Sequence, residues 1–278
     1  MVVRHLGNTD FKVIMDCFLV AFENYFVKMP TDPNFYKQRW QAAGVRFNMS
    51  YGMFDGTQLV GFIINAVDER HGERIAYNSG TGVIPEYRGQ GIVKAIYDYA
   101  IPDLIKKGIT KCLLEVITEN VKAISSYEGV GFKIEKHYKC FGGTISSESP
   151  DEFTLKELDF NAVDWDNIPN QTFYSWDNQT KTLEKGQYKH VEVYVDKGLV
   201  AFFSINPDNG YLVQFEILKQ ADSSWPTLFA AIALQRKEVR INNIDSSLIS
   251  KIKAVECAGL KNTVDQYEMG LSLKNRNL

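Results

Sequence analysis

The feature that most constrains this chain is a glycine-rich turn that leads directly into a helix. Residues 83–94 read VIPEYRGQGIVK, in which an apolar strand ends at Ile84 and helical spacing of apolar residues begins at Ile92. The first amide N–H groups of a helix have no partners within the helix, and the helix dipole adds partial positive charge there. Gly89 and Gly91 lack a Cβ, so the backbone can approach a bulky anion closely. The run predicts either a phosphate or pyrophosphate site or a tight connection between strand and helix.

Two better-known phosphate loops are excluded by their spacing. A G-x-G-x-x-G fingerprint begins at Gly80, but proline occupies position 85, where the third glycine is required. A P-loop requires Gly-Lys-Ser/Thr after its glycines, whereas Gly91 is followed by Ile92 and Val93. The turn is therefore neither a dinucleotide fingerprint nor a P-loop.

Strands and helices alternate after this turn. Residues 112–117 form an apolar run short enough to be a buried strand, and residues 118–120 open a second helix. That helix stops at residues 129–131, and another strand begins at Phe132. Pro102 lies inside the first helix, where it should remove a hydrogen bond and kink or break the helix. The order indicates an α/β fold.

The stretch from about residue 74 to residue 141 resembles the GNAT superfamily, the Gcn5-related N-acetyltransferases. Their acetyl-CoA motif, Arg/Gln-x-x-Gly-x-Gly/Ala, corresponds to residues 88–93, with Val93 in place of the last small residue. Their next motif resembles Asn-x-x-Ala-x-x-x-Tyr-x-x-x-Gly-Phe. It stands here with every spacing kept as Asn120, Ala123, Tyr127, Gly131 and Phe132. The Leu-Glu-Val at 114–116 is similar to the ribosomal-protein N-terminal acetyltransferase subgroup.

The resemblance implies a GNAT fold, a central mixed sheet flanked by helices. It also implies an acyltransferase that moves an acetyl group from acetyl-CoA to a primary amine by direct attack. Gly80 and Gly82 predict a strand bulge, which in this family parts two strands so that the pantetheine arm lies between them. Val93 should weaken cofactor binding mildly. The implied cofactor-binding residues are Thr81, Gly82, Val83, Arg88, Gly89, Gln90, Gly91, Ile92, Val93, Lys94 and Asn120.

Two side chains are candidates for proton transfer. Glu115 interrupts an apolar strand, where burial would raise the pKa of its carboxyl into the range of a general base. The alternatives are a salt bridge at a strand edge and a solvated cleft without a role. Tyr127 is the position to which the family assigns its general acid, and it is otherwise a core tyrosine. Asn120 is either a cofactor ligand or a helix N-cap.

The chain divides into two halves. Residues 1–145 read as a complete domain with the acetyl-CoA site, and the small polar residues 142–152 read as an exposed linker. From about residue 191, strands and helices follow the order of the first half from its hairpin onward. We therefore expect a duplicated fold, with a degenerate GNAT-like domain at 150–278. Its helix start at 220–226 lacks glycine, and Asp222 there would repel a pyrophosphate.

Composition excludes several other classes. The formal net charge is −3, from 31 Lys+Arg and 34 Asp+Glu residues, so we expect no nucleic-acid or anionic-membrane partner. The four scattered cysteines form no Cys-x-x-Cys pair and have no histidine at metal spacing, so no metal site is expected. With free thiols, no signal peptide and no long apolar stretch, the sequence indicates a cytoplasmic protein.

Two functions of different class remain. The first is an acetyl-CoA-dependent N-acetyltransferase, and the second is a non-catalytic acyl-CoA-binding or scaffold protein that retains the fold. Glu115 and Tyr127 together favour the enzyme. The sequence leaves open the acceptor (a metabolite amine, an antibiotic, a peptide N-terminus or a lysine), the length of the acyl group and the oligomeric state.

Overall fold

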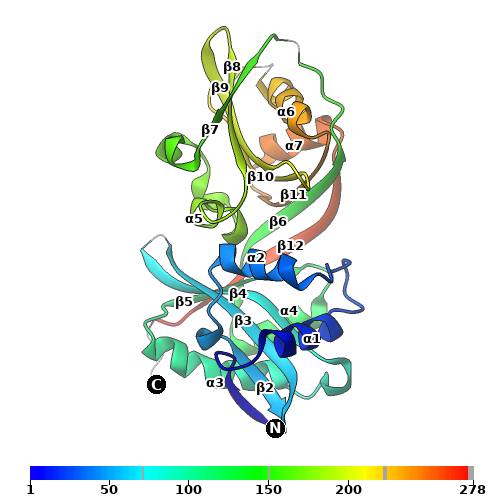
Figure 1. The fold of residues 1–278 in the computed structure, drawn as a ribbon, viewed down its shortest axis with the longest axis vertical. Coiled ribbons are helices and arrows are strands. Elements are labelled where there is room, and N and C mark those ends of the chain that lie inside the picture. The colour runs from blue at the N-terminus through cyan, green and yellow to red at the C-terminus, as the bar shows by residue number, and fades with distance from the viewer. Residues whose placement is uncertain (71, 150, 222–223, 275–278) are drawn as a thin grey trace. The chain divides into compact units, whose positions relative to one another are not determined.

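The computed structural model describes residues 1–70, 72–149, 151–221 and 224–274. The chain forms two compact units (Figure 1). Unit 1 consists of Met1–Glu135 together with Glu268–Leu278, and unit 2 consists of Lys136–Tyr267. The last strand of the sequence therefore belongs partly to the first unit.

Unit 1 is built on a mixed sheet with the strand order β1-β2-β3-β4-β5-β12. Its first four strands are antiparallel neighbours, whereas β4 and β5 run parallel. The elements are β1 Val2–His5, α1 Phe11–Ala21, α2 Pro33–Ala43, η1 Phe47–Met49, β2 Tyr51–Asp55, β3 Gln58–Arg70, β4 Glu73–Val83, η2 Pro85–Tyr87, α3 Ile92–Lys106, β5 Lys111–Ile117, α4 Val121–Val130 and β12 Lys261–Ser272.

The first two helices begin where the sequence supplies N-caps. The carboxylate of Asp10 accepts a hydrogen bond from the Lys12 amide at 2.7 Å, and Asp32 accepts one from the Asn34 amide at 2.9 Å. An aspartate at such a position satisfies amides that the helix cannot pair and favours its dipole. Both helices therefore begin at an aspartate N-cap.

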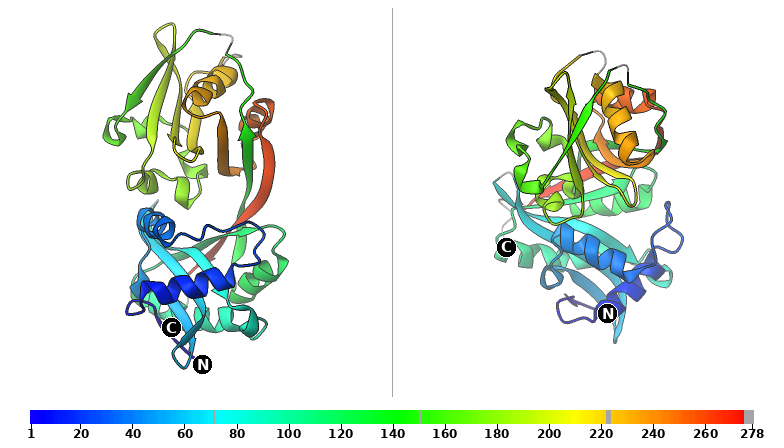
Figure 2. Two further views of the ribbon diagram at one scale, coloured as in Figure 1. Left: turned by 45° about the vertical axis from the view of Figure 1, so that its right-hand side comes forward. Right: turned by 45° about the horizontal axis from the view of Figure 1, so that its top comes forward.

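Helices cover both faces of the unit 1 sheet (Figure 2). On one face, Phe18 of α1 stacks on Phe62 of β3, with ring centroids 5.6 Å apart. On the other, Ile92 of α3 lies so close to Gly61 that a Cβ there would come within 2.8 Å of it. Gly61 and Phe62 are consecutive strand residues and so point to opposite faces. The glycine thus allows α3 to lie directly on the sheet.

A bulge in β4 ends its pairing with β5. Ile64 of β3 pairs with Gly80 and Asn65 pairs with Asn78, so Ser79 is the extra residue. Pairing of β4 with β5 is recorded from Ile75 and Lys111 only as far as Asn78 and Leu114. Beyond this point the two strands part. We call the space between residues 79–83 of β4 and 115–117 of β5 the β4–β5 opening; the predicted bulge is confirmed.

Of the two effects expected of Pro102, a kink or a break of its helix, the break does not occur. Helix α3 continues through it from Ile92 to Lys106. Because Pro102 has no N–H, the carbonyl of Asp98 loses the hydrogen bond that residue 102 would otherwise donate to it. Both Pro102 and Asp98 lie on an exposed face of the helix. Water can hydrogen-bond that carbonyl, so the helix continues.

Unit 2 is built on a sheet with the strand order β6-β11-β10-β9-β8-β7. Strands β10 and β11 are parallel, and β11 pairs antiparallel with β6. The elements are β6 Lys133–Thr144, β7 Thr154–Leu158, η3 Phe160–Ala162, η4 Trp165–Asn167, η5 Gln171–Phe173, η6 Trp176–Asn178, α5 Thr180–Leu183, β8 Lys189–Val195, β9 Gly198–Asn206, β10 Tyr211–Ile217, α6 Ser224–Gln235, β11 Glu238–Asp245 and α7 Ile249–Cys257.

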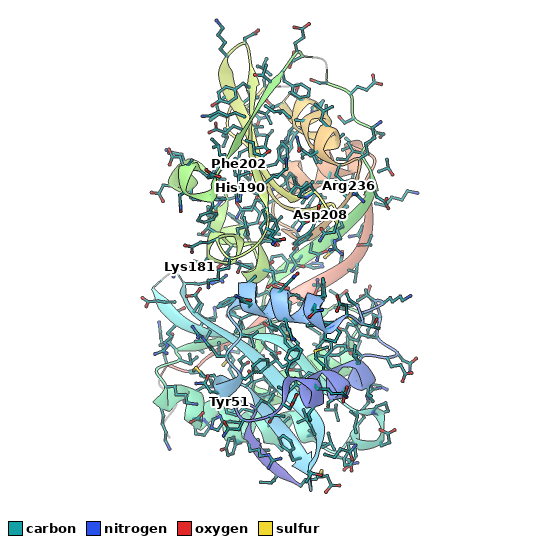
Figure 3. The ribbon with its side chains drawn as sticks, viewed as in Figure 1. Tyr51, Lys181, His190, Phe202, Asp208 and Arg236 are labelled. Atoms are coloured by element: carbon teal, nitrogen blue, oxygen red, sulfur yellow. The ribbon has the colours of Figure 1, made fainter. Side chains whose placement is uncertain are left out.

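The two faces of the unit 2 sheet are covered differently. Phe203 packs into the main core with the apolar residues of α6 and α7. Its neighbour Phe202 stacks on His190, with rings 3° from parallel, and contacts Trp165 from the segment between β7 and β8 (Figure 3). That segment contains short turns η3–η6 and α5 in place of two long helices. The sequence did not predict it.

The last helix and the last strand of the two halves repeat with a spacing of 128 residues. Strand β6 runs from 133 to 144 and β12 from 261 to 272, and 261 minus 133 is 128. Hydrogen bonds repeat with the same spacing: Phe132 N–H donates to the Tyr127 carbonyl at 3.1 Å and Leu260 N–H to the Val255 carbonyl at 3.3 Å. Because β6 pairs with β11 and β12 is the neighbour of β5, the repeats exchange these strands between the units.

The segment expected to be an exposed linker is partly ordered in unit 2. Gly142 and Gly143 lie within strand β6 and pair with β11. Ser146 N–H then donates to the Ala258 carbonyl at 2.9 Å, and Ser149 Oγ lies 3.0 Å from Thr227 Oγ1. The small polar residues therefore pin this segment to α6 and α7.

Candidate functional site

Unit 1 contains a row of amides that point away from every acceptor in the described chain. None of the backbone N–H groups of residues 89–94 donates a hydrogen bond to the part of the chain that the structure describes. The first bond of α3 is from Ala95 N–H to the Gly91 carbonyl, at 3.0 Å. We call residues 89–94 the amide cradle. Such a row of donors at a helix start favours a bound anion.

Glycine is required at two positions of the cradle. Gly89 has φ +76° and Gly91 has φ +70°, both in the left-handed region that other residues rarely adopt. A Cβ at either position would meet no protein atom within 4 Å. The space in front of the cradle is therefore open.

Arg88 supports the cradle instead of lining it. Its Nε donates to the Val83 carbonyl at 3.1 Å, and a terminal nitrogen donates to the Ala21 carbonyl at 2.9 Å. The side chain thus joins the end of α1, the end of β4 and the turn. Among the described contacts of Arg88, these carbonyls take the guanidinium, so its link to an anion is indirect.

The other side chains of the cradle differ in their partners and in their burial. Gln90 Nε2 donates to the Glu86 carbonyl at 3.3 Å, and Lys94 Nζ forms an ion pair with Asp98 at 2.7 Å. Ile92 is buried, whereas Val93 is half-buried. What these residues share is a backbone amide that is available to a ligand.

The β4–β5 opening is lined by a buried polar network. Asn78 Nδ2 donates to Thr81 Oγ1 at 2.5 Å and to the Tyr97 hydroxyl at 2.9 Å. The Gly80 amide donates to Asn78 Oδ1 at 2.9 Å. Gly82 approaches α1 so closely that a Cβ there would lie 2.8 Å from that of Ala21. Thr81 and Gly82 thus lie at the opening, as predicted.

Tyr127 of α4 reaches this network. It is 8% exposed, its ring lies 5.9 Å from that of Phe132, and its hydroxyl is hydrogen-bonded to Thr81. Burial raises the pKa of Tyr127 to about 12, while the Thr81 hydrogen bond acts in the opposite direction and nearby Tyr25 raises it slightly. The phenol is therefore protonated throughout the neutral range.

Glu115 lies on β5 directly beyond the last residue that pairs with β4. The strand alternates, with Cys112, Leu114 and Val116 buried and Lys111 half-buried. Glu115 is half-buried on the more accessible face. The sequence led us to expect a buried carboxylate, and the Oε1 atom of Glu115 is indeed buried although the residue as a whole is half-buried.

Asn120 is the N-cap of α4. Its Oδ1 accepts a hydrogen bond from the Ala123 amide at 3.3 Å, and its side chain hydrogen-bonds to Tyr25. Tyr25, which follows α1, is thereby brought toward the hydroxyl of Tyr127. The alternative role of Asn120, a helix cap, is the one that the contacts show.

Asn78 is the site residue that sequence reasoning missed. It stands inside the strand ERIAYNSGTGV, where a buried amide requires hydrogen-bond partners. Its place immediately before Ser-Gly was the available signal, because an asparagine side chain readily bonds the amide two residues ahead.

Unit 2 has the same frame but fills its opening. Strand β10 has an equivalent bulge at Val213, between Leu212 and Gln214. Three residues after the bulge residue, β10 has Glu216 where β4 has Gly82. At the 128-residue spacing, Asn243 replaces Glu115, Lys251 replaces Ala123 and Val255 replaces Tyr127.

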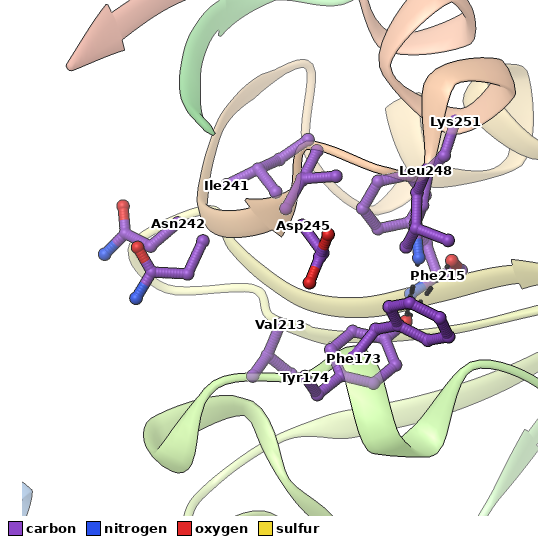
Figure 4. Close-up of a pocket in the computed structure, with 11 residues that line it drawn as sticks. Phe173, Tyr174, Val213, Phe215, Ile241, Asn242, Asp245, Leu248 and Lys251 are labelled. Atoms are coloured by element: carbon purple, nitrogen blue, oxygen red, sulfur yellow. Dashed lines mark hydrogen bonds between the residues drawn. The ribbon is translucent and has the colours of Figure 1, made fainter. Parts of the chain in front are cut away.

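A buried ion pair occupies the space in unit 2. Lys251 Nζ donates to Glu216 Oε1 at 2.6 Å. It also donates to the Tyr174 hydroxyl at 2.9 Å (Figure 4). Tyr174 also donates to Glu216, and the Lys251 ammonium lies 4.2 Å from the centroid of the Phe215 ring. Burial lowers the pKa of Lys251, and Glu216 opposes that shift. The cavity beside them is about 10 Å³, room for one water molecule.

The helix start in unit 2 also lacks a cradle. Ser224 N–H donates to the Ala221 carbonyl at 3.1 Å, and Ser224 Oγ accepts from the Ala221 amide at 2.9 Å. Pro226, in the first turn of α6, has no N–H to offer. The predicted repulsion by Asp222 concerns a residue outside the described part of the chain.

Two other kinds of site do not occur among the described residues. No cluster of three or more His, Cys, Asp or Glu side chains there is arranged to hold a metal ion. No helix in that part of the chain has the length and apolar character needed to cross a membrane.

The buried ion pair predicts a specific stability pattern. Lys251→Met leaves the Glu216 carboxylate buried without its cation, which should reduce the free energy of unfolding by about 3–5 kcal/mol. Adding Glu216→Gln removes the unpaired charge and should recover most of this loss. Lys253→Met, at an exposed position of the same helix, should have almost no effect. Denaturant unfolding of the four proteins checks the pattern, and equal losses in the single and double variants would contradict it.

Comparison with known proteins finds a family match in the first half of the chain. Residues 14–132 match the acetyltransferase (GNAT) family. A ribosomal protein bS18-alanine N-acetyltransferase of Escherichia coli is 40% identical over 50 residues, which are 18% of this chain and 34% of that protein. The chain therefore spans about a third of the length of this relative.

Two solved structures match nearly the whole chain. A putative acetyltransferase from Pyrococcus horikoshii aligns with a TM-score of 0.69 at 12% identity, over 98% of this chain and 89% of that one. A tandem GNAT protein from the clavulanic acid biosynthesis pathway aligns with a TM-score of 0.68 at 14% identity, over 99% and 100%. At these identities the likeness concerns the fold. Residues 14–132 therefore match the acetyltransferase (GNAT) family, and the chain as a whole has the fold of a tandem GNAT protein.

Proposed function

We propose that the protein is an acetyl-CoA-dependent N-acetyltransferase that acts on a primary amine by direct attack. The observation that carries the proposal is the amide cradle beside the β4–β5 opening, with the hydroxyl of Tyr127 at that opening. Members of the GNAT family generally use acetyl-CoA, and the family match covers residues 14–132. The acceptor stays open, and the E. coli relative makes a peptide N-terminus one candidate to test.

The residues of unit 1 fit acetyl-CoA. The amides of residues 89–94 would hold its pyrophosphate, because they are unsatisfied, adjacent to a helix N-terminus and open in front. The backbone of residues 81–83 would lie along the pantetheine arm, where β4 has parted from β5. Asn120 would contribute through the position of α4. When bound, acetyl-CoA supplies an activated acetyl group.

Tyr127 would act as the general acid. Its phenol is protonated at neutral pH, since burial raises its pKa to about 12. A thiolate released at the opening can take the phenolic proton, although burial makes this phenol a weaker acid than a free tyrosine. Thr81 stabilises the phenolate that remains, through the hydrogen bond already present.

Glu115 would act as the general base, directly or through a water molecule. The attacking amine must lose a proton, because an ammonium has no lone pair. Glu115 stands on the half-accessible face of β5, at the first position past the Asn78–Leu114 pairing. An acceptor entering the opening would therefore pass its carboxylate.

We also propose that the repeats divide at 145 and 150 and that the second is degenerate and without catalytic activity. Asn243 and Val255 stand where the first repeat has Glu115 and Tyr127. The buried Lys251–Glu216 pair fills the corresponding opening. A protein that binds acyl-CoA but transfers nothing would indicate instead a binding or scaffold role for the whole chain.

The cradle is tested by Gly91→Glu. A side chain at φ +70° strains the turn, and its carboxylate would occupy the space meant for an anion, so CoA affinity should fall at least about 100-fold. Gly72→Glu is the matched control, because Gly72 has φ +72° and similarly open surroundings in another turn. Calorimetry with CoA should find the control unchanged. Normal CoA affinity in Gly91→Glu would remove the cradle as the binding site.

The acid is tested by Tyr127→Phe. Removing only the hydroxyl should leave CoA affinity nearly unchanged and slow turnover by about 10²–10⁴-fold. Since the folded pKa is about 12, the wild-type rate should show no falling limb from this group between pH 7 and about 10. Tyr99→Phe removes a hydroxyl from an exposed ring and serves as the control. Unchanged turnover in Tyr127→Phe would mean that the ring only packs.

The base is tested by Glu115→Gln. We expect kcat/KM to fall about 10²–10⁴-fold below the pKa of the acceptor amine, with acetyl-CoA affinity retained. The loss should shrink as pH rises, because more of the amine is then already neutral. Glu119→Gln, an exposed carboxylate just after β5, should behave as wild type. If kcat is unaffected in Glu115→Gln at every pH and only the amine KM rises at low salt, Glu115 merely attracts a cation.

A further inference from the structure

The side chain of Asn78 makes three hydrogen bonds within β4 and to α3. Its side chain is 8% exposed, yet its oxygen and its nitrogen together contact the Gly80 amide, Thr81 and Tyr97. All of these partners lie at the bulge that begins the β4–β5 opening. The side chain therefore both fixes the bulge and connects to the groups that line it.

The direction of these bonds follows from the chemistry of the partners. The Gly80 N–H can only donate, so it fixes Asn78 Oδ1 as the acceptor and turns Nδ2 toward Thr81 and Tyr97. An amide nitrogen can only donate, so Thr81 Oγ1 and the Tyr97 oxygen accept from it. Thr81 has one proton of its own, and it must donate that proton elsewhere.

Tyr127 is the acceptor that this proton can serve. The hydroxyls of Tyr97 and Tyr127 both hydrogen-bond to Thr81. Tyr97 already accepts from Asn78 at 2.9 Å, whereas Thr81 is the side-chain hydrogen-bond partner of Tyr127. With its oxygen accepting from Thr81, the phenol of Tyr127 must direct its own proton away from Thr81.

We propose that Asn78 is a positioning residue, which acts through Thr81 to point the phenolic proton of Tyr127 into the β4–β5 opening. The proposal rests on the proposed function, in which that proton goes to the departing thiolate. Asn78 itself touches neither substrate. Its contribution is to keep Thr81 a donor, because a threonine hydroxyl can otherwise rotate and accept.

Asn78→Asp tests the direction of the bonds without changing the shape of the side chain. The carboxylate still accepts from the Gly80 amide, so the bulge is retained, but it can no longer donate to Thr81. Thr81 then donates to the carboxylate, and Tyr127 turns its proton back toward Thr81. We expect kcat to fall at least about 10-fold, which corresponds to the loss of about one hydrogen bond in the transition state. The KM for acetyl-CoA should change less than about 3-fold.

Asn65→Asp is the matched control. Asn65 is 3% exposed, pairs with Asn78 in the register of β3 and β4, and donates to the Met49 carbonyl at 2.8 Å. The variant places a carboxylate at a similar depth but outside the Asn78–Thr81–Tyr127 hydrogen bonds, which we call the relay. Its kcat should therefore fall less than that of Asn78→Asp, and equal losses in the two variants would overturn the proposal.

A readout independent of turnover is the ionisation of residue 127. A fluorinated tyrosine installed there reports its own titration by fluorine NMR, at lower pH because fluorine makes the phenol more acidic. Thr81→Val removes the donor and should move this titration to higher pH, as should Asn78→Asp, whereas Thr81→Ser should keep it near that of the parent protein. A titration that stays in place in both Thr81→Val and Asn78→Asp would overturn the relay.

The two hypotheses fail in different ways. Normal turnover in Tyr127→Phe would refute the acid role in the proposed function, and the titration would still decide whether Asn78 and Thr81 orient the phenol. Slow turnover in Tyr127→Phe with an unchanged kcat in Asn78→Asp would leave the acid role intact and overturn the positioning role of Asn78.

Discussion

The parting of β4 from β5 is the constraint on which the rest of the site depends. One extra residue, Ser79, ends the pairing after Asn78 and Leu114. A parallel pair that stopped without support would leave buried polar groups unsatisfied, which is costly. Asn78 supplies that support, because its amide bonds the Gly80 N–H and Thr81 across the bulge. The opening is therefore held by side chains of β4 itself, and it faces a helix whose first amides are unsatisfied.

The second unit shows that the frame alone does not make a site. It repeats the bulge, the parallel pair and the helix after the pair. Its opening, however, is filled by Lys251, Glu216 and Tyr174, and its helix start is closed on Ser224 and contains Pro226. A small number of residue differences thus separates an open frame from a packed one. The fold is retained because a fully hydrogen-bonded ion pair satisfies the groups that the opening would leave exposed.

The sequence predicted those parts of the fold that depend on local rules. The bulge near Gly80 and the glycine turn before α3 follow from backbone preferences, and the structure confirms them. Of the two effects expected of Pro102, a kink or a break, the break does not occur, because the effect of a proline depends on whether the freed carbonyl can reach water. Glu115 is half-buried as a residue because of the alternation along β5, while its Oε1 atom is buried as expected.

Other features depend on partners far apart in the sequence. The strand patterns of β6 and β12 show where strands form, but nothing in them states that β6 belongs mainly to unit 2 and that the end of β12 belongs to unit 1. The role of Asn78 required knowing that Tyr97 and Thr81 converge on it. Predicting that the second opening is filled would have required knowing that Glu216 pairs with Lys251, and these residues are separated by a helix and a strand.

Of the two similar frames in this chain, one is proposed to hold a CoA site and the other to have lost it. The most direct test is the stoichiometry of CoA binding to the full chain, measured by calorimetry with a protein concentration fixed independently. We expect one CoA per chain, with no second binding event at higher ligand concentration. Two equivalent sites per chain, or none, would contradict the proposed difference between the frames.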